Sequence, residues 1–230
     1  MEIEILHLVA GARAARGIAV VIDVFRAFTT ACFAFENGAE SILAVGELET
    51  AFAWKRAHPD YLLIGERHGA APPGFDYGNS PAQLERIDLA GRTVIQTTSA
   101  GTQGLVNAVG ADEVVTGAFV NAGAIVRYLR AKNPARVSVV CMGREALEPT
   151  VEDTACAEFL RDRLEERAPD FAALRERIRA AESARKFFDP EATWAPERDF
   201  ELCLALDRFP FVLRAEPVAE SVCRLTRVES

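Results

Sequence analysis

The sequence lacks the features that mark several large classes of protein. No apolar run approaches the roughly 20 residues that a membrane-spanning helix needs, so no membrane segment is expected. The first residues include no basic region followed by an apolar stretch, so no signal peptide is expected either. Lysine and arginine form no basic cluster, and the formal net charge is −8. A nucleic acid is therefore not an expected partner, because it requires a surface that neutralises phosphates.

Histidine and paired cysteines are scarce as well. There are three histidines, and the five cysteines include no CxxC pair, so neither a zinc site nor a disulfide framework is indicated. Such cysteines are typically small core residues in a reducing compartment, which predicts a cytoplasmic protein. Half of the 230 residues are apolar, which is enough for a sizeable core. We expect one globular domain that spans residues 1–230.

The chain is organised around an apolar run that ends in polar residues. Residues 18–22 are all apolar and mostly β-branched, which predicts a strand buried on both faces. Asp23 stands where this strand ends, Arg26 follows, and Thr29 and Thr30 lead into an apolar helix. Open α/β sheets bind ligands at such carboxyl ends. Asp23 or Thr29 could instead cap the helix, but a cation at the positive end of a helix dipole favours an anion there.

The rest of the chain alternates between patterns typical of strands and of helices. Strands are predicted at residues 3–9, 41–45, 61–64, 93–96, 110–115 and 136–141, with a further one near Phe211. Helices are predicted at residues 47–57, 102–109, 119–131, 152–167, 171–187 and 199–206. Residues 11–17 and 70–81 are expected to be loops because glycine and proline interrupt regular structure there. This alternation predicts an α/β fold with a mainly parallel sheet.

A second unit of the chain resembles the first. Residues 93–115 follow the order strand, polar turn, helix and strand, and Gly110-Ala111-Asp112 corresponds to Gly38-Ala39-Glu40 in the first unit. The similarity indicates an internal duplication. It predicts two anion-binding turns at the same edge of one sheet.

Acids and hydroxyl groups gather at the predicted strand ends. The acids are Asp23, Glu66, Asp76, Glu152 and Asp153. The candidate anion binders are Arg26, Arg67, Thr97, Thr98, Ser99, Gly101 and Thr102. Carboxylates hold Mg²⁺ while hydroxyls, backbone amides and arginines hold phosphate oxygens, so this set suits phosphoryl chemistry. Each group also has a structural alternative, since the threonine turn can cap a helix and the paired acids can stabilise a helix start.

Three familiar schemes for such chemistry do not match. The chain contains no Walker A loop. It contains no GxSxG nucleophile elbow either. A haloacid dehalogenase-type phosphatase is expected to carry a second aspartate two residues after the first, where this chain has Phe25.

Four motifs in order resemble the 2-phosphosulfolactate phosphatase family. They occupy residues 22–30, 65–67, 74–81 and 97–102, and the residues that accompany them are Asn121, Gly143, Glu152 and Asp153. The resemblance covers residues 20–164 and, more loosely, 201–207. It implies a Mg²⁺-dependent phosphatase with a three-layer α/β/α fold. The family reaction converts 2-phosphosulfolactate to sulfolactate and phosphate, a step in coenzyme M synthesis.

The resemblance also implies roles for individual residues. Asp23, Arg26 and Glu66 would be catalytic, and Asp23, Glu66 and Asp153 would hold Mg²⁺. The substrate, a small phosphorylated acid, would contact Thr29, Thr30, Arg67, Asn79, Ser80, Thr97, Thr98, Ser99, Gly101, Thr102 and Asn121. The chain departs from the family pattern at Phe28, at residues 99–100 and at residues 144–150, and these departures bear on the substrate more than on the reaction.

Several alternatives stay open from sequence. The phosphoryl acceptor is either a metal-activated water or Asp23 itself. A non-catalytic anion-binding module would keep Arg26 and the threonine turn but needs no array of acids. A Mg²⁺-dependent mutase or lyase acting on another phosphorylated acid is a third reading. The sequence also leaves open a homo-oligomer.

Overall fold

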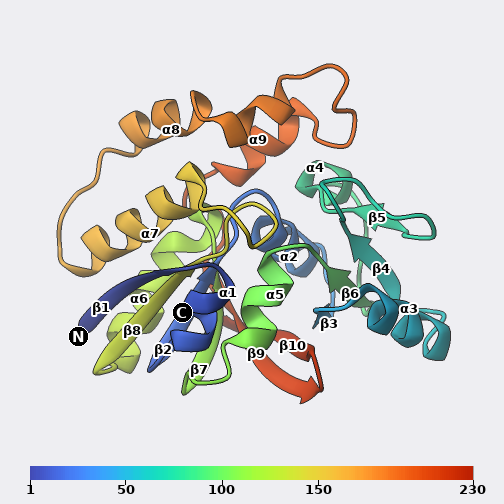
Figure 1. Cartoon of the computed structure of the whole chain (residues 1–230), viewed down its shortest axis with the longest axis horizontal. Coiled ribbons are helices and arrows are strands. Elements are labelled where there is room, and N and C mark those ends of the chain that lie inside the picture. The colour runs from blue at the N-terminus through green and yellow to red at the C-terminus, as the bar shows by residue number, and fades with distance from the viewer. Residues whose placement is uncertain (230) are drawn as a thin grey trace.

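The computed structural model describes residues 1–229, which build one ten-stranded sheet with helices on both faces (Figure 1). The strands are β1 (Glu2–His7), β2 (Ile18–Ile22), β3 (Ser41–Val45), β4 (Leu62–Gly65), β5 (Tyr77–Gly78), β6 (Thr93–Thr97), β7 (Glu113–Gly117), β8 (Arg136–Cys141), β9 (Phe211–Ala219) and β10 (Val222–Glu229). The α-helices are α1 (Leu8–Ala14), α2 (Ala27–Glu36), α3 (Leu48–Ala57), α4 (Pro81–Leu84), α5 (Gly101–Asn107), α6 (Ala122–Lys132), α7 (Val151–Leu164), α8 (Phe171–Arg179) and α9 (Glu197–Cys203). Two 3₁₀ helices, η1 (Phe119–Asn121) and η2 (Glu182–Phe187), complete the chain.

Two blocks of parallel strands flank an antiparallel hairpin. The sheet order is β1-β8-β2-β7-β9-β10-β3-β6-β4-β5. The three steps from β7 through β9 and β10 to β3 are antiparallel, so the two parallel blocks run in opposite senses along this order. Figure 1 shows one block at the left, the other at the right and the β9–β10 hairpin below them. Since twist accumulates from strand to strand, ten strands rotate the two blocks well away from a flat arrangement.

Alternating side chains of β2 explain why the whole strand is buried. Ala19 and Val21 pack with α1, α2 and α5 on one face of the sheet. Ile18, Val20 and Ile22 pack with α6 and α7 on the other face. A strand covered on both faces needs apolar residues at every position. The predicted three-layer α/β/α fold with a mainly parallel sheet is confirmed.

Most of the predicted elements are present, and several have the predicted bounds. The strands at 18–22, 41–45 and 136–141 match residue for residue. The two similar units correspond to β2-α2-β3 and β6-α5-β7. The first unit runs from the block that contains β2 and β7 to the block that contains β3 and β6, and the second unit runs back, because β2 pairs with β7 and β3 pairs with β6. The duplication itself stays a prediction.

Four features of the secondary structure differ from the predictions. The expected loop at 11–17 is largely α1, which packs on β1 so closely that a Cβ at Gly11 would lie 2.9 Å from the Leu6 Cβ. The expected helix at 171–187 is interrupted at Ala181, whose backbone is extended, and continues as η2. The 70–81 stretch contains the short strand β5 and the first residue of α4, and β10 was not predicted. In each case packing against distant segments outweighs local preference.

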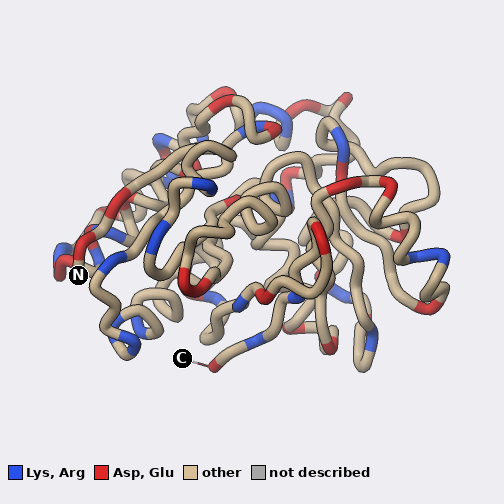
Figure 2. The backbone as a smooth tube through the Cα atoms, turned by 60° about the horizontal axis from the view of Figure 1, so that its bottom comes forward, with Lys and Arg blue, Asp and Glu red and all other residues tan. Residues whose placement is uncertain are grey.

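Basic and acidic residues are mixed along the chain. Figure 2 shows basic and acidic segments interspersed along the chain. All five cysteines are buried free thiols. Across residues 1–229 no helix has both the length and the apolar character to cross a bilayer.

Candidate active site

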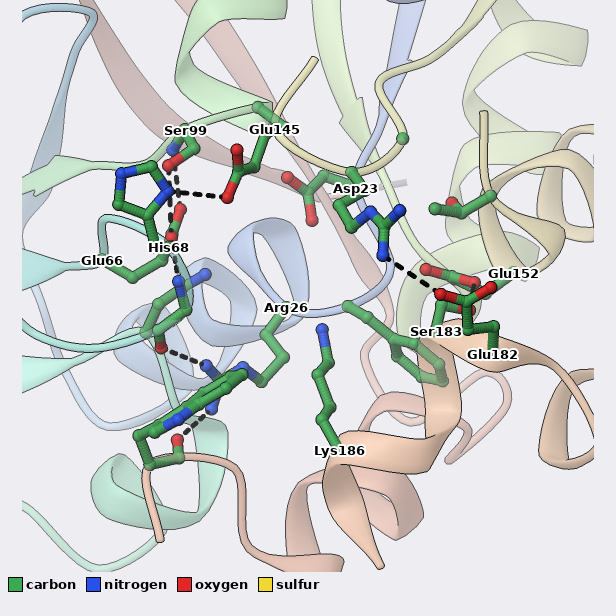
Figure 3. A pocket seen from close by; sticks show the side chains of 18 residues that line it. Asp23, Arg26, Glu66, His68, Ser99, Glu145, Glu152, Glu182, Ser183 and Lys186 are labelled. Atoms are coloured by element: carbon green, nitrogen blue, oxygen red, sulfur yellow. Dashed lines mark hydrogen bonds and ion pairs between the residues drawn. The ribbon is translucent and has the colours of Figure 1, made fainter. Parts of the chain in front are cut away.

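A cavity of about 260 Å³ lies where the carboxyl ends of the two parallel blocks meet. The segments after β2 and β8 contribute Asp23 and Gly143 to its lining, and the segments after β4 and β6 contribute Glu66 and Ser99. Asn79 and Glu152 also line it, and the remaining wall, the C-terminal wall, comes from residues 182–194 (Figure 3). The predicted meeting of two polar turns is therefore present, although the turns belong to blocks of opposite sense.

Asp23 is the buried carboxylate at the end of β2. Its side chain is 6% exposed, and its Oδ1 accepts a hydrogen bond from the Ala27 N–H at 3.1 Å. Burial, together with the negative charges of Glu66 and Glu152, raises the pKa of Asp23 to about 6. Gly101 permits this arrangement, because a Cβ there would lie 2.8 Å from Asp23 Oδ2. The first turn of α5 therefore closes directly over the carboxylate.

Replacing Asp23 by asparagine is expected to change how the stability of the metal-free protein depends on pH. The folded-state pKa of about 6 lies above the usual value of 3.8, so the folded protein holds this proton at a pH where the unfolded chain has lost it. Asp23 therefore stabilises the fold most below pH 3.8, and this contribution, about 3 kcal/mol, is lost as the pH rises through 6. The stability of Asp23→Asn relative to the wild type should therefore increase from about pH 4 to pH 6 and then level off. Urea unfolding across that range in a chelator measures the effect, and parallel pH curves for the two proteins would contradict it.

Glu66 holds two parts of the cavity wall together. Its Oε1 accepts from the Ser99 N–H at 2.6 Å, and its Oε2 accepts from the Gly69 N–H at 2.8 Å. The Ser99 hydroxyl donates to the same Oε2 at 3.2 Å. Glu66 lines the cavity beside Asp23, as predicted. Its oxygens are nonetheless engaged by the loop after β4 and by the turn after β6.

The paired acids at the start of α7 have different surroundings. Asp153 accepts from the Val24 N–H at 2.9 Å and from the Gly143 N–H at 2.8 Å, so it joins the ends of β2 and β8. Burial, together with the charges of Asp23 and Glu152, raises the pKa of Asp153. Glu152 lines the cavity, whereas Asp153 lies behind its wall. The predicted Mg²⁺ ligands Asp23, Glu66 and Asp153 thus do not all face the cavity.

Arg26 lines the cavity, but protein groups surround its guanidinium. Its Nη1 donates to Asp199 Oδ2 at 2.8 Å and to the Trp194 carbonyl at 2.6 Å, and its Nη2 donates to the Gly69 carbonyl at 2.9 Å. The guanidinium also lies 5.4 Å from the centre of the Trp194 ring. Asp199 is held in turn by the Ser80 hydroxyl at 2.8 Å. Arg26 therefore ties the C-terminal wall of the cavity to the rest of the site.

Two predicted substrate contacts, Asn79 and Ser99, line the cavity. Asn79 is 4% exposed, and its Oδ1 has no hydrogen-bond partner among the residues that the structure describes. Asn79, which the resemblance implied as a substrate contact, therefore lies on the same cavity as Asp23. Asp76 of the same loop instead accepts from the Leu63 N–H and pairs with Lys55, away from the cavity.

Most of the other predicted substrate contacts make structural hydrogen bonds, and all of them lie outside the cavity lining. Arg67 donates to the Thr97 hydroxyl at 2.8 Å, and Thr98 and Thr102 bond to each other. Thr29 donates to the Val24 carbonyl, Ser80 caps α4, and Asn121 accepts from the Ala118 N–H. The Thr30 hydroxyl is buried without a partner in the described part of the chain. The threonine turn thus acts locally as the helix-capping alternative describes.

Sequence reasoning missed the cavity residues of the C-terminal wall. Ser183 donates to Glu152, and Lys186 and Trp194 line the same side. These residues fall in a stretch predicted as an ordinary helix and a tail. The one available signal was that Lys186 precedes two phenylalanines, where a solvated helix face is not expected.

The departures from the family pattern fall mostly on this cavity. Ser99 and Ala100 line it, as do Arg144, Glu145 and Thr150 of the 144–150 segment. The Thr150 hydroxyl is buried and has no partner within residues 1–229. Phe28, by contrast, packs in the core. Most of the departures from the family pattern therefore lie on the cavity lining.

Within residues 1–229 the structure has no preformed metal-binding cage. No group of three or more histidine, cysteine, aspartate or glutamate residues in the described chain is placed to hold a metal ion. Asp23, Glu152 and Asn79 are among the lining residues whose oxygens could ligate a cation.

Comparisons with known proteins give a consistent result. The family model described as 2-phosphosulpholactate phosphatase matches residues 4–217. A relative from Bacillus subtilis, "Probable 2-phosphosulfolactate phosphatase", is 32% identical over 207 residues, which cover 88% of this chain and 89% of the relative. A relative of the same name from Thermotoga petrophila is 32% identical over 203 residues (84% and 87%). One from Deinococcus radiodurans, again of that name, is 41% identical over 147 residues (62% and 61%).

Proposed function

The chain belongs to the 2-phosphosulpholactate phosphatase family, and we propose that it hydrolyses the phosphate ester of a small 2-phospho acid, with 2-phosphosulfolactate as the substrate. Its reaction class is phosphoric monoester hydrolysis. The single observation that carries the proposal is the small cavity in which buried Asp23, with its raised pKa, lies among residues from both parallel blocks. Perturbed carboxylates in an enclosed cavity are typical of catalytic sites.

The size and polarity of the cavity support a small, highly charged substrate. Its volume of about 260 Å³ is below the range typical of drug-sized ligands. The Thr150 hydroxyl at its wall, which has no partner among the described residues, can donate to an anionic oxygen, and the Asn79 oxygen can ligate a cation that accompanies the anion. A phosphorylated hydroxy acid with one or two further acidic groups matches these dimensions and this polarity.

Mg²⁺ fits the donor set, and we propose Asp23 and Glu152 as its protein ligands. Mg²⁺ usually binds one or two carboxylates together with waters and substrate phosphate oxygens, so a three-residue cage is not required. The charges of Glu66 and Glu152 disfavour ionised Asp23, and a divalent cation would offset that repulsion. Bound there, Mg²⁺ would neutralise charge on the transferring phosphoryl group. Glu66 and Asp153 would then position the wall segments.

The chain's own residues orient the reacting groups. The Ala27 N–H holds Asp23 Oδ1 at 3.1 Å, which leaves Oδ2 toward α5 and the cavity. Ser183 orients Glu152 from the opposite wall. In one route water attacks the phosphorus, the P–O bond to the hydroxy acid breaks, and the proton of that water passes to the leaving alkoxide. In the other, Asp23 Oδ2 attacks first, and water then hydrolyses the phosphoaspartate and supplies the proton. Both routes require ionised Asp23.

A phosphate-release assay tests the proposal. We expect the protein to release inorganic phosphate from 2-phosphosulfolactate with Mg²⁺ and to lose at least tenfold in rate in a chelator. Phosphorylated 2-hydroxy acids without a sulfonate serve as the specificity control. Tight substrate binding without phosphate release would support an anion-binding module instead. Substrate consumption without phosphate release would support a mutase or lyase. A role in coenzyme M synthesis, the cytoplasmic location and a homo-oligomer stay predictions.

A further inference from the structure

The C-terminal wall of the cavity presents a lysine ammonium. Lys186 lies on η2, is partly buried and lines the cavity. Figure 3 shows its side chain extending from η2 into the cavity, on the side where Asp23 and Arg26 lie. The Phe25 and Phe187 rings flank it, with centres 5.9 and 5.2 Å from its Nζ. The lysine stem therefore rests on an apolar wall, while its charge faces the polar part of the cavity.

The other cations of the cavity are already paired. Arg26 pairs with buried Asp199, and Arg144 pairs with Glu148 and Glu182. The His68 ring contacts Glu145 at 2.8 Å. Lys186 has no hydrogen bond or ion pair within residues 1–229. It is thus the cavity cation whose charge is available to a ligand.

The position of Lys186 is fixed by contacts on both sides of it in the chain. Ser183, one turn earlier, donates its hydroxyl to Glu152 on α7. Trp194 and Asp199, later in the chain, are held by Arg26. Lys186 lines the same cavity as Asp23, Glu152 and Arg26. Burial and the charge of Arg26 lower the pKa of Lys186, whereas the charges of Glu152 and Asp23 oppose that shift. A ligand that reaches Asp23 therefore also comes near the ammonium.

We propose that Lys186 is a catalytic residue that contacts the oxygens of the phosphoryl group of the substrate. This inference rests on the proposed function and adds a residue to it. An ammonium is a compact point charge with three donors, which suits a phosphate that moves during transfer. Arg26 is less available for this contact, because three of its five N–H donors hold Asp199 and two carbonyl groups and its charge is balanced by Asp199. Lys186 thus takes the anion-binding role that the sequence pattern assigned to Arg26.

Lys186→Met and Lys186→Arg test the proposal against Arg185→Met as the matched control. Arg185 is the neighbouring residue on η2 and is exposed, so its loss should leave turnover and phosphate binding within about twofold. Lys186→Met keeps the apolar stem and should fold, because it removes a partly buried charge. It should lower kcat/KM at least about 100-fold and raise the inhibition constant of inorganic phosphate at least about tenfold. Lys186→Arg should recover part of both losses.

The readouts separate this inference from the proposed function. If Lys186→Met keeps wild-type kcat/KM and phosphate inhibition, Lys186 does not contact the phosphoryl group, and the hydrolase proposal stands. If activity falls while the inhibition constant of phosphate is unchanged, the lysine is structural and the inference is wrong. If the wild type hydrolyses no phosphate ester but phosphate raises its melting temperature, loss of that shift in Lys186→Met supports the anion contact without the proposed function.

Discussion

Asp23→Asn is expected to lower kcat for phosphate release by at least about 1,000-fold while the fold stays intact. Asparagine has nearly the shape of aspartate and still accepts the hydrogen bond that Ala27 donates at 3.1 Å. It carries no negative charge for Mg²⁺, and its amide cannot serve as a nucleophile. Both routes of phosphoryl transfer therefore fail together. Steady-state kinetics with 2-phosphosulfolactate measures the loss.

Asp76→Asn is the matched control for this substitution. Asp76 is also a loop aspartate that accepts a backbone hydrogen bond, at 2.8 Å from the Leu63 N–H, but it lies outside the cavity lining. Its variant should keep wild-type kcat. Mg²⁺ should raise the melting temperature of the wild type and of the control, and should raise that of Asp23→Asn much less. If Asp23→Asn keeps both its activity and its Mg²⁺-dependent shift, Asp23 is only a helix cap and the site assignment is wrong.

Arg26→Met is expected to lower the free energy of unfolding by about 3–5 kcal/mol. The substitution leaves Asp199, which is fully buried, without its cation. It also removes the bonds that hold Trp194 and Gly69 at the cavity wall. Arg26→Lys keeps the charge, but one ammonium cannot reproduce the planar set of three contacts. We therefore expect Arg26→Lys to lose at least about tenfold in kcat/KM.

Arg198→Met is the control that separates the effect of the buried Arg26–Asp199 pair from that of an ordinary surface ion pair. Arg198 pairs with Glu85 at the surface, where half of the arginine side chain is exposed, and such pairs contribute about 1 kcal/mol or less. Urea unfolding of the two variants gives the comparison. Asp199→Asn in the Arg26→Met background should restore part of the lost stability, because it removes the unpaired charge. Equal, small losses for Arg26→Met and Arg198→Met would show that the buried pair has no special role.

The sequence by itself determined the local elements and the position of the principal carboxylate. Strands such as β2, β3 and β8 were predictable because a strand buried on both faces is made mainly of consecutive apolar residues, which is a property of neighbouring residues. Asp23 was predictable for the same reason, since it is the first charged residue after such a run. The family motifs then indicated the reaction class and placed Glu66 and Asn79 at the same site.

Only the tertiary structure decided which charged groups are free to meet a ligand. Arg26 is engaged by Asp199, 173 residues away in sequence, and Lys186 reaches the cavity from the C-terminal wall. Asp153 and Glu152 are adjacent in sequence, yet one is bound by backbone amides and the other faces the cavity. Whether a buried charge is paired depends on which distant segments the fold brings together. Here the site lies where two strand blocks of opposite direction meet in one twisted sheet. The spacing of residues along the sequence does not specify these long-range contacts. The sequence therefore identified the chemistry of the site, and the tertiary structure determined which groups its charges pair with.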